Sequence, residues 1–125
     1  MTLLLDTHVV LWWMAGERDR IGKKATEAIA GGEAEVIISA VVIWEVAIKR
    51  GLGKLDAPAD LLVQLEQAGV GLLPISAQHA DRVGSLPMHH QDPFDRLLIA
   101  QAMTDGLTLV SADEAMCNYE VEVLW

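Results

Sequence analysis

Short apolar runs alternate with longer amphipathic segments along the whole chain. The short runs predict five buried strands, over residues 3–5, 35–38, 72–75, 107–110 and 121–124. The segments between them predict helices over residues 8–15, 23–30, 40–50, 58–69 and 77–83, and from 95 to the glycine at 106. Strands that alternate with helices indicate a parallel sheet covered on both faces. The predicted fold class is therefore α/β, with a central parallel sheet of about five strands.

Residues that favour helix ends support these boundaries. Ser39 and Ser76 each stand where a helix N-cap is expected, and Gly51 follows basic residues at the end of its helix. Asp92 precedes Pro93, and proline is favoured at the first helical position. We therefore interpret Asp92 as a structural cap, which leaves Asp95 free to point out of the first turn.

The composition is that of a folded protein. The chain has 125 residues, of which 52% are hydrophobic, and it shows no repeat or linker, so we expect one domain over residues 1–125. No apolar run is long enough to span a membrane, and Asp6 and His8 interrupt the apolar start, which argues against a signal peptide. The single cysteine, Cys117, agrees with a reducing compartment, so we expect a cytoplasmic protein.

The formal net charge of −9 argues against an ordinary nucleic-acid-binding protein, because such proteins normally present a basic face to phosphates. A bound divalent cation reverses the local sign, however, and an acidic surface attracts basic partners. The charge thus limits the nucleic-acid interpretation without excluding it.

Four acidic residues stand where predicted strands give way to helices or loops: Asp6, Glu45, Asp95 and Asp113. The carboxyl ends of parallel strands share one edge of a sheet, where open α/β folds bind ligands. Carboxylates gathered there would repel one another unless a cation held them, and oxygen ligands suit Mg²⁺ or Mn²⁺. The sequence therefore predicts a metal site at this edge.

Each of these carboxylates also has a simpler explanation. Asp6 is well placed to cap the helix that follows it, and aspartate is common at turns such as the one expected at Asp113. Glu45 lies among apolar neighbours, where a carboxylate is seldom buried unless it is paired or bound to a ligand, although Lys49 lies four residues on.

Other polar residues near these positions are open to two interpretations. His89 and His90 can be metal ligands, but the proposed site is rich in oxygen, so we interpret them as part of a polar loop. Arg96 can anchor a phosphate, or it can form a salt bridge with Asp92 or Glu45, and the sequence favours the salt bridge.

Taken together, four segments resemble the PIN-domain ribonucleases, and specifically the VapC-type toxins of toxin–antitoxin modules. They are Leu-Leu-Leu-Asp-Thr-His at 3–8, Ser-Ala-Val-Val-Ile-Trp-Glu-Val at 39–46, Asp-Pro-Phe-Asp-Arg-Leu-Leu-Ile-Ala-Gln-Ala at 92–102 and Leu-Val-Ser-Ala-Asp at 109–113. They span nearly the whole chain in the family's order, and the third is long and specific.

This resemblance implies a PIN-like fold and a Mg²⁺-dependent endoribonuclease that leaves a 5′-phosphate and a 3′-hydroxyl. It places the family's acidic positions on the four carboxylates, and Thr7 and Ser111 match accessory hydroxyl positions. Asp92 and Arg96 would support the site. The resemblance also implies a cognate antitoxin protein as partner, and a homodimer.

Three alternatives remain to be compared. Haloacid-dehalogenase phosphatases need a second Asp two residues after the first, where this chain has His8, and response-regulator receivers need an acceptor Asp after the third strand, which is missing. Both classes are therefore disfavoured. A PIN-like fold kept as a non-catalytic nucleic-acid or protein binding module is the third alternative, although the acidic set looks complete.

Overall fold

The computed structural model describes residues 1–125 and contains a five-stranded parallel sheet with the strand order β3-β2-β1-β4-β5. The strands are β1 (Thr2–Leu5), β2 (Glu35–Ser39), β3 (Gly71–Leu73), β4 (Thr108–Val110) and β5 (Val123–Leu124). The chain builds outward from β1 to β2 and β3, and then returns to the other side of β1 to add β4 and β5. The predicted α/β fold with a parallel sheet is confirmed.

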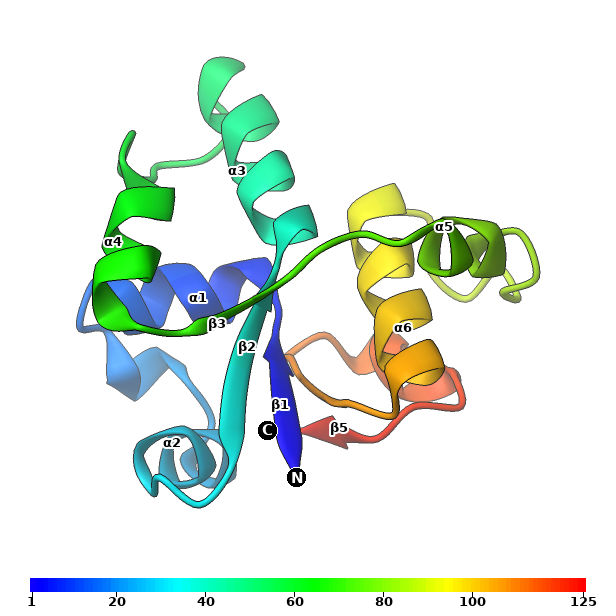
Figure 1. Cartoon of the computed structure of the whole chain (residues 1–125), viewed down its shortest axis with the longest axis horizontal. Helices are drawn as coiled ribbons and strands as arrows, with labels where there is room; N and C mark the ends of the chain where they lie inside the picture. The colour runs from blue at the N-terminus through cyan, green and yellow to red at the C-terminus, as the bar shows by residue number, and fades with distance from the viewer.

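Helices cover both sides of this sheet. They are α1 (Thr7–Met14), α2 (Lys23–Ala30), α3 (Ala40–Gly51), α4 (Leu61–Ala68), α5 (Ala77–Val83) and α6 (Pro93–Asp105), with the short 3₁₀ helices η1 (Arg18–Arg20) and η2 (Glu114–Asn118). In Figure 1, α1, α2 and α4 lie to the left of β1 and β2, whereas α5 and α6 lie to their right. None of the helices combines the length and the apolar composition that crossing a bilayer requires.

Several predicted boundaries were wrong by one to three residues: α6, for example, begins at Pro93 and not at 95, directly after its cap Asp92, and three other shifts also have a local cause. The helix expected from residue 58 begins at Leu61, the first residue of that segment to be buried in the core. The third strand ends at Leu73 because Pro74 has no N–H to continue the ladder. The fifth strand begins at Val123, since the N–H of Val121 is already used in a tight turn to the carbonyl of Tyr119.

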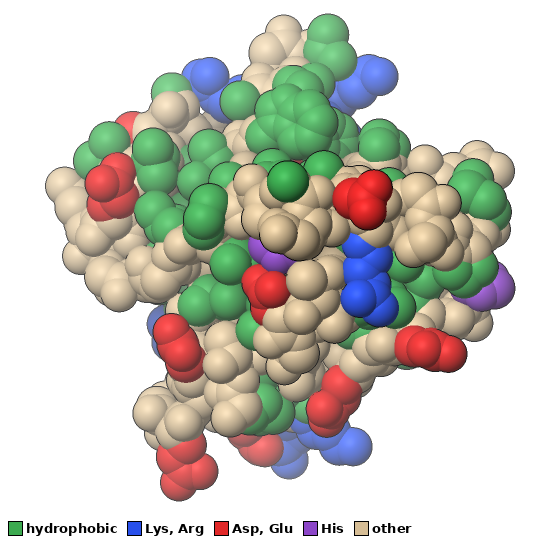
Figure 2. Space-filling model, turned by 45° about the vertical axis from the view of Figure 1, so that its right-hand side comes forward, with side chains coloured by type: hydrophobic (Ala, Val, Ile, Leu, Met, Phe, Trp, Pro, Cys, Tyr) green, Lys and Arg blue, Asp and Glu red, His purple; other side chains and the backbone are tan.

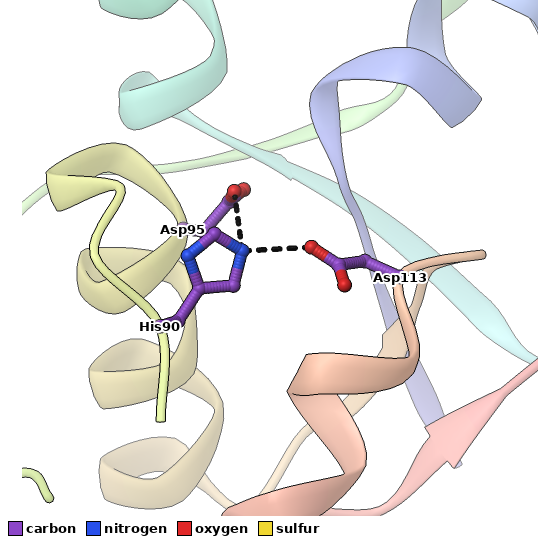
Figure 3. Close-up of side chains that lie close together, drawn as sticks. All are labelled: His90, Asp95 and Asp113. Carbon is purple, nitrogen blue, oxygen red and sulfur yellow. Dashed lines mark hydrogen bonds and ion pairs between the residues drawn. The ribbon is translucent and has the colours of Figure 1, made fainter. Parts of the chain in front are cut away.

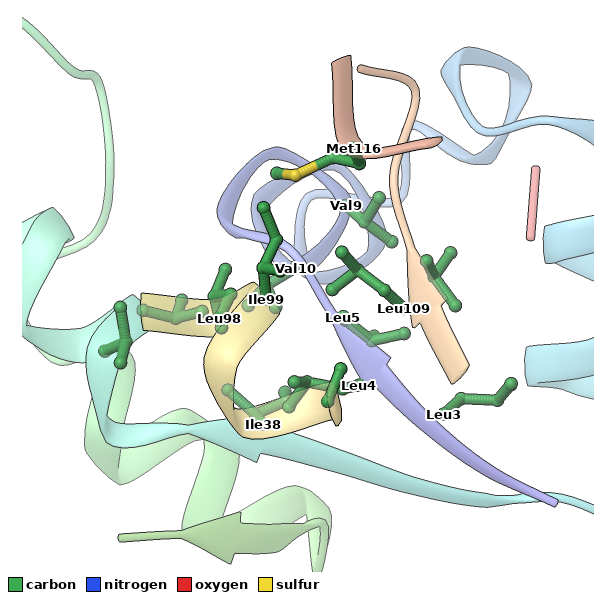
Figure 4. Close-up of a cluster of buried hydrophobic side chains, with 14 of the residues drawn as sticks. Leu3, Leu4, Leu5, Val9, Val10, Ile38, Leu98, Ile99, Leu109 and Met116 are labelled. Atoms are coloured by element: carbon green, nitrogen blue, oxygen red, sulfur yellow. The ribbon is translucent and has the colours of Figure 1, made fainter. Parts of the chain in front are cut away.

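The core forms where β1 and β4 meet α1 and α6. Leu3, Leu4 and Leu5 of β1 are almost completely buried, as the apolar run predicted. Figure 4 shows them with Val9 and Val10 of α1, Leu98 and Ile99 of α6, and Leu109 of β4 packed around the strand. Burial on both faces of β1 explains why its sequence is continuously apolar instead of alternating.

Buried polar contacts then fix α6 against the sheet. The Ser39 hydroxyl donates to Gln101 Oε1 over 2.6 Å, and Gln101 Nε2 donates to the carbonyl of Pro74 over 3.3 Å. Gln101 is completely buried, so both of its polar atoms need these partners. The second half of α6 consequently lies beside the N-terminus of α3, and Phe94 in the first turn of α6 packs against Trp44 farther along α3, with ring centroids 4.8 Å apart.

Candidate metal centre

The predicted carboxylates come from four elements that meet at the carboxyl edge of the sheet. Asp6 follows β1, Asp113 follows β4, Glu45 lies on α3 and Asp95 lies in the first turn of α6. The chain changes direction between β1 and β4, and open parallel sheets form a ligand crevice at such a point.

Asp6 is both a helix cap and a buried carboxylate. Its Oδ1 accepts from the backbone N–H of Val9 over 3.0 Å, so the capping interpretation is confirmed. Burial raises the pKa of Asp6 above its ordinary value, against the opposing effects of the Ser111 hydroxyl, the Val9 N–H and His8; the charge of Glu45 raises it further. Capping uses one carboxylate oxygen of Asp6, which leaves the other for a second interaction.

Glu45 is buried in the interior, with an exposed fraction of 3%. The Thr7 hydroxyl donates to its Oε1 over 2.5 Å, and Lys49 Nζ donates to its Oε2 over the same distance. The pairing of Glu45 with Lys49 four residues on, which the sequence offered as a simpler explanation, is therefore present. Both oxygens are held, so the direction of this carboxylate is fixed.

Lys49 extends from α3 to the start of α6. Its Nζ lies 3.5 Å from Asp92 Oδ2 as well as beside Glu45. Burial favours the neutral form of Lys49, but hydrogen bonding and the charges of Glu45 and Asp92 outweigh that effect and raise its pKa. The side chain thus places a permanent positive charge among the carboxylates. Asp92 also caps α6 by accepting from the N–H groups of Phe94 and Asp95, as predicted.

Asp95 carries the strongest electrostatic signal of the site. Burial raises its pKa to about 7, and repulsion from Asp92, Glu45 and Asp6 adds to this effect, whereas His90 opposes it. Like charges that shift a pKa must lie close to the group, so the sheet edge brings these carboxylates together. Strong perturbation of this kind is typical of functional sites.

His90 joins Asp95 to Asp113. Its Nε2 lies 3.2 Å from Asp95 Oδ2 and 2.7 Å from Asp113 Oδ2. Figure 3 shows the imidazole between the two carboxylates, one from α6 and one from the loop before η2. One ligand atom from each of these three residues falls within 4.8 Å of the others, the spacing of a metal-binding group. Asp113 also caps η2 by accepting from the N–H of Ala115.

Arg96 does neither of the things that the sequence suggested. Its guanidinium donates to four backbone carbonyls and to the Tyr119 hydroxyl, and it forms no ion pair with Asp92 or Glu45. The four carbonyls belong to Val83, Leu86, Pro87 and His90. The expected salt bridge was wrong, because α6 turns this side chain away from the carboxylates and toward the 83–90 loop. With these five acceptors, Arg96 has little capacity left for a phosphate.

The structure divides the predicted residues into two neighbouring groups. Asp6, Thr7, Glu45 and Ser111 are buried, whereas Asp95 and Asp113 are more accessible and share His90. Sequence reasoning missed the role of His90, for which the only signal was its position two residues before Asp92. The i, i+4 spacing had offered Lys49 as a partner for Glu45, but nothing in the sequence indicated the contact of Lys49 with Asp92.

Comparison with known proteins identifies the family of this chain. Residues 3–122 match the model of the PIN domain. The chain belongs to the PIN-domain family. Ribonuclease VapC22 of Mycobacterium tuberculosis is 31% identical over 124 residues, which cover 94% of this chain and 92% of that protein. The resemblance to VapC-type PIN proteins is thereby confirmed.

Solved structures of low sequence identity share the PIN fold. VapBC2 from Rickettsia felis, bound to a DNA fragment from its promoter, has a TM-score of 0.72 at 16% identity and covers 99% of this chain and 98% of its own. DNA-bound VapBC from Salmonella typhimurium has a TM-score of 0.71 at 17% identity, covering 99% and 97%. FitAcB from Neisseria gonorrhoeae has a TM-score of 0.66 at 22% identity, covering 98% and 96%.

The donor set at this PIN-domain edge suits a hard divalent cation. Carboxylate oxygens predominate, and repulsion from Asp92, Glu45 and Asp6 adds to the effect of burial in raising the pKa of Asp95. A cation such as Mg²⁺ or Mn²⁺ would relieve that repulsion, and both prefer oxygen ligands. The residues that can hold it are Asp6, Glu45, Asp95 and Asp113.

Proposed function

We propose that the protein is a metal-dependent endoribonuclease and the toxin of a VapBC-type toxin–antitoxin module. The observation that carries this proposal is the meeting of carboxylates from four elements around Asp95: Asp6 and Glu45 help to raise its pKa to about 7, and His90 joins it to Asp113. The relative named a ribonuclease, VapC22, supports the choice of RNA as substrate. Residues 1–125 would act as one cytoplasmic domain.

In this proposal, each carboxylate has a role that follows from its surroundings. Asp6 and Asp95 would hold Mg²⁺, or Mn²⁺, with Asp113 completing the site. A divalent cation at this place neutralises phosphate charge and lowers the pKa of a bound water. Glu45 is fixed by Thr7 and Lys49, so it is suited to orient the attacking water or to ligate. Ser111, which favours the ionised form of Asp6, would keep that ligand charged.

Lys49 and Asp92 would act around these ligands. The Lys49 ammonium is fixed between Glu45 and Asp92 and remains partly exposed, so it can meet a phosphate oxygen of the RNA. Asp92 keeps the first turn of α6 in place by capping it, and Asp95 stands in that turn. Arg96 supports the site indirectly by holding the loop that carries His90.

A cognate antitoxin is the proposed protein partner. The solved structures with this fold include toxin–antitoxin complexes. A net charge of −9 would favour a basic antitoxin segment. The surface also offers apolar area, and in Figure 2 hydrophobic side chains gather in the upper part of the face. The exposed apolar residues of α3, its C-cap and α4 are Trp44, Ile48, Leu52, Leu62 and Val63. We propose that such surfaces also serve a homodimer.

The test is cleavage of structured and single-stranded RNA by the purified protein, in Mg²⁺ and in EDTA. We expect cleavage only with the cation, with products carrying a 5′-phosphate and a 3′-hydroxyl. Asp95→Asn should lower the rate at least about a hundredfold, because one carboxylate ligand is lost. Asp19→Asn is the matched control, since it removes the same charge from an exposed position in η1.

Two results would contradict the proposal. Cleavage that persists unchanged in EDTA would exclude the metal mechanism. Binding of RNA without any cleavage, in Mg²⁺ and in Mn²⁺, would favour the non-catalytic binding module instead. A search for a short antitoxin-like reading frame beside the gene, followed by co-expression and co-purification of its product, tests the antitoxin.

A further inference from the structure

Hydrogen bonds to its backbone N–H and carbonyl hold His90 in place. Its N–H donates to the Tyr119 hydroxyl over 2.9 Å, and its carbonyl accepts from Arg96 Nη1 over 3.3 Å. The Tyr119 hydroxyl in turn donates to the carbonyl of Pro87. The side chain of His90 is 15% exposed. A loop residue fixed by a buried guanidinium and a phenol is placed about as firmly as one on a helix, so the direction of its imidazole is well defined.

The two ring nitrogens of His90 have different partners, and these assign its tautomer. The backbone N–H of Asp92 donates to Nδ1 over 3.1 Å. Because a backbone amide can only donate, Nδ1 carries the lone pair and the neutral ring carries its proton on Nε2. Nε2 faces Asp113 Oδ2 and Asp95 Oδ2, which are both acceptors. The imidazole therefore donates its hydrogen bond to Asp113, and the same Nε2 lies 3.2 Å from Asp95 Oδ2.

This tautomer is the wrong one for a metal ligand. A histidine that binds a metal through Nε2 needs its lone pair there, and it then donates an N–H from Nδ1 to an acceptor. Here Nδ1 faces a donor, the amide of Asp92. Ligation would break that hydrogen bond and set two N–H groups against each other. The spacing of His90, Asp95 and Asp113 resembles a ligand set, but the hydrogen bonds oppose that interpretation.

We propose that His90 is a positioning residue that acts through its Nε2–H and not a ligand of the metal. The N–H joins Asp95 on α6 to Asp113 after β4, two elements that no other side-chain hydrogen bond or ion pair connects at this edge. It thereby holds two proposed ligands at a set separation before the cation arrives. This inference rests on the proposed metal-dependent function, and it adds a residue that the carboxylate set does not include.

Two substitutions separate donation from ligation. In His90→Gln the side-chain amide N–H can reach the region of Nε2–H, whereas His90→Ala removes the donor. His89→Ala is the matched control, because the His89 ring packs against Tyr119 with centroids 5.1 Å apart and forms no hydrogen bond or ion pair with a carboxylate. Mn²⁺ affinity is measured by calorimetry, the surroundings of bound Mn²⁺ by pulsed electron paramagnetic resonance, and kcat and KM with RNA in Mg²⁺.

We expect no directly bonded ¹⁴N signal on Mn²⁺ in the unsubstituted protein. His90→Ala should weaken Mn²⁺ binding about tenfold or more, since lost outer partners of metal ligands have effects of that size. His90→Gln should stay within about threefold of the unsubstituted protein, as expected if a single N–H is what matters. The change in catalysis should fall on kcat, because the RNA itself does not contact His90 in this proposal.

Each other outcome overturns the inference. A ¹⁴N coupling that disappears in His90→Ala would make His90 a ligand. If His90→Ala bound Mn²⁺ as tightly as the unsubstituted protein, the contacts of His90 with Asp95 and Asp113 would not position the ligands. If His90→Gln lost as much Mn²⁺ affinity as His90→Ala, the hydrogen bond donated by the side chain would not be the cause. If the unsubstituted protein cleaves RNA while these tests fail, the proposed function survives. If no RNA is cleaved, the Mn²⁺ measurements still decide the place of His90.

Discussion

Replacing Asp95 by Asn should make the protein more stable in EDTA while it removes the response to a cation. The pKa of Asp95 is raised from 3.8 to about 7, chiefly by burial and then by the neighbouring carboxylates. At about 1.4 kcal/mol for each pH unit between the unfolded and folded pKa values, the ionised carboxyl destabilises the folded state by about 4 kcal/mol. Asn keeps the shape of the side chain and an oxygen that accepts from His90, but burying its amide group also costs free energy. We therefore expect the free energy of unfolding to rise by about 2–4 kcal/mol.

The pH dependence follows from the direction of the shift. The folded pKa lies above the unfolded one, so the folded protein binds more protons at intermediate pH. The stability that protonated Asp95 contributes to the folded state is therefore complete at acid pH and is lost as the pH rises from about 4 to about 7. Asp6, whose pKa is also raised, acts in the same direction in both proteins. The advantage of Asp95→Asn should be small near pH 4 and greatest above pH 7.

The measurement is urea unfolding followed by tryptophan fluorescence, in EDTA at pH 5 and pH 8 and then with excess Mn²⁺. With Mn²⁺ at about a hundred times its dissociation constant, the unsubstituted protein should gain about 2.7 kcal/mol and the variant much less. Asp19→Asn should follow the unsubstituted protein in every condition. Equal unfolding midpoints for Asp95→Asn and the unsubstituted protein at pH 8 in EDTA would refute the electrostatic reasoning.

Three further substitutions test single contacts, each by urea unfolding. Lys49→Met removes the ammonium group that pairs with the buried Glu45, so the free energy of unfolding should fall by on the order of 3 kcal/mol at neutral pH. Excess Mn²⁺ should reduce this loss. A loss that stays the same in Mn²⁺ would argue that Lys49 and the metal do not act on the same charges. Arg96→Met should lower the free energy of unfolding by on the order of 3 kcal/mol, because several buried carbonyls lose their hydrogen-bond donor. A loss below about 1 kcal/mol would mean that water replaces the guanidinium as donor. Asp92→Ala should cost about 1 kcal/mol through loss of the α6 cap, whereas Asp60→Ala, where no side-chain cap bond exists, should cost only a few tenths. Equal costs at both positions would contradict the capping account.

Much of this fold can be read from the sequence because its signals are local. Apolar runs predicted all five strands, and the caps at Ser39, Ser76 and Asp92 act within three residues of the helix starts that they define. Gly106 ends α6 with a positive φ of 66°, a conformation that favours glycine. The alternation of strand and helix then implied a parallel sheet, whose carboxyl edge collects the residues that follow each strand.

The partners of the site residues were decided only by the tertiary structure. The placement of β1 between β2 and β4 puts Ser111 beside Asp6, and nothing local in either segment encodes that neighbour. The contacts of Arg96 could not be predicted, because most of its acceptors are backbone carbonyls, and every residue type carries a carbonyl.

The four carboxylates were thus visible in the sequence as residue types at strand ends, and the tertiary structure decided how they are charged and joined. The pKa of Asp95 depends on burial and on carboxylates up to 89 positions away in the chain, such as Asp6. His90 became a bridge because Tyr119 and Arg96 fix its loop and the Asp92 amide fixes its tautomer. Helix caps and strand runs depend on neighbours in the chain, but electrostatic coupling depends on distance in space, and only folding sets that distance.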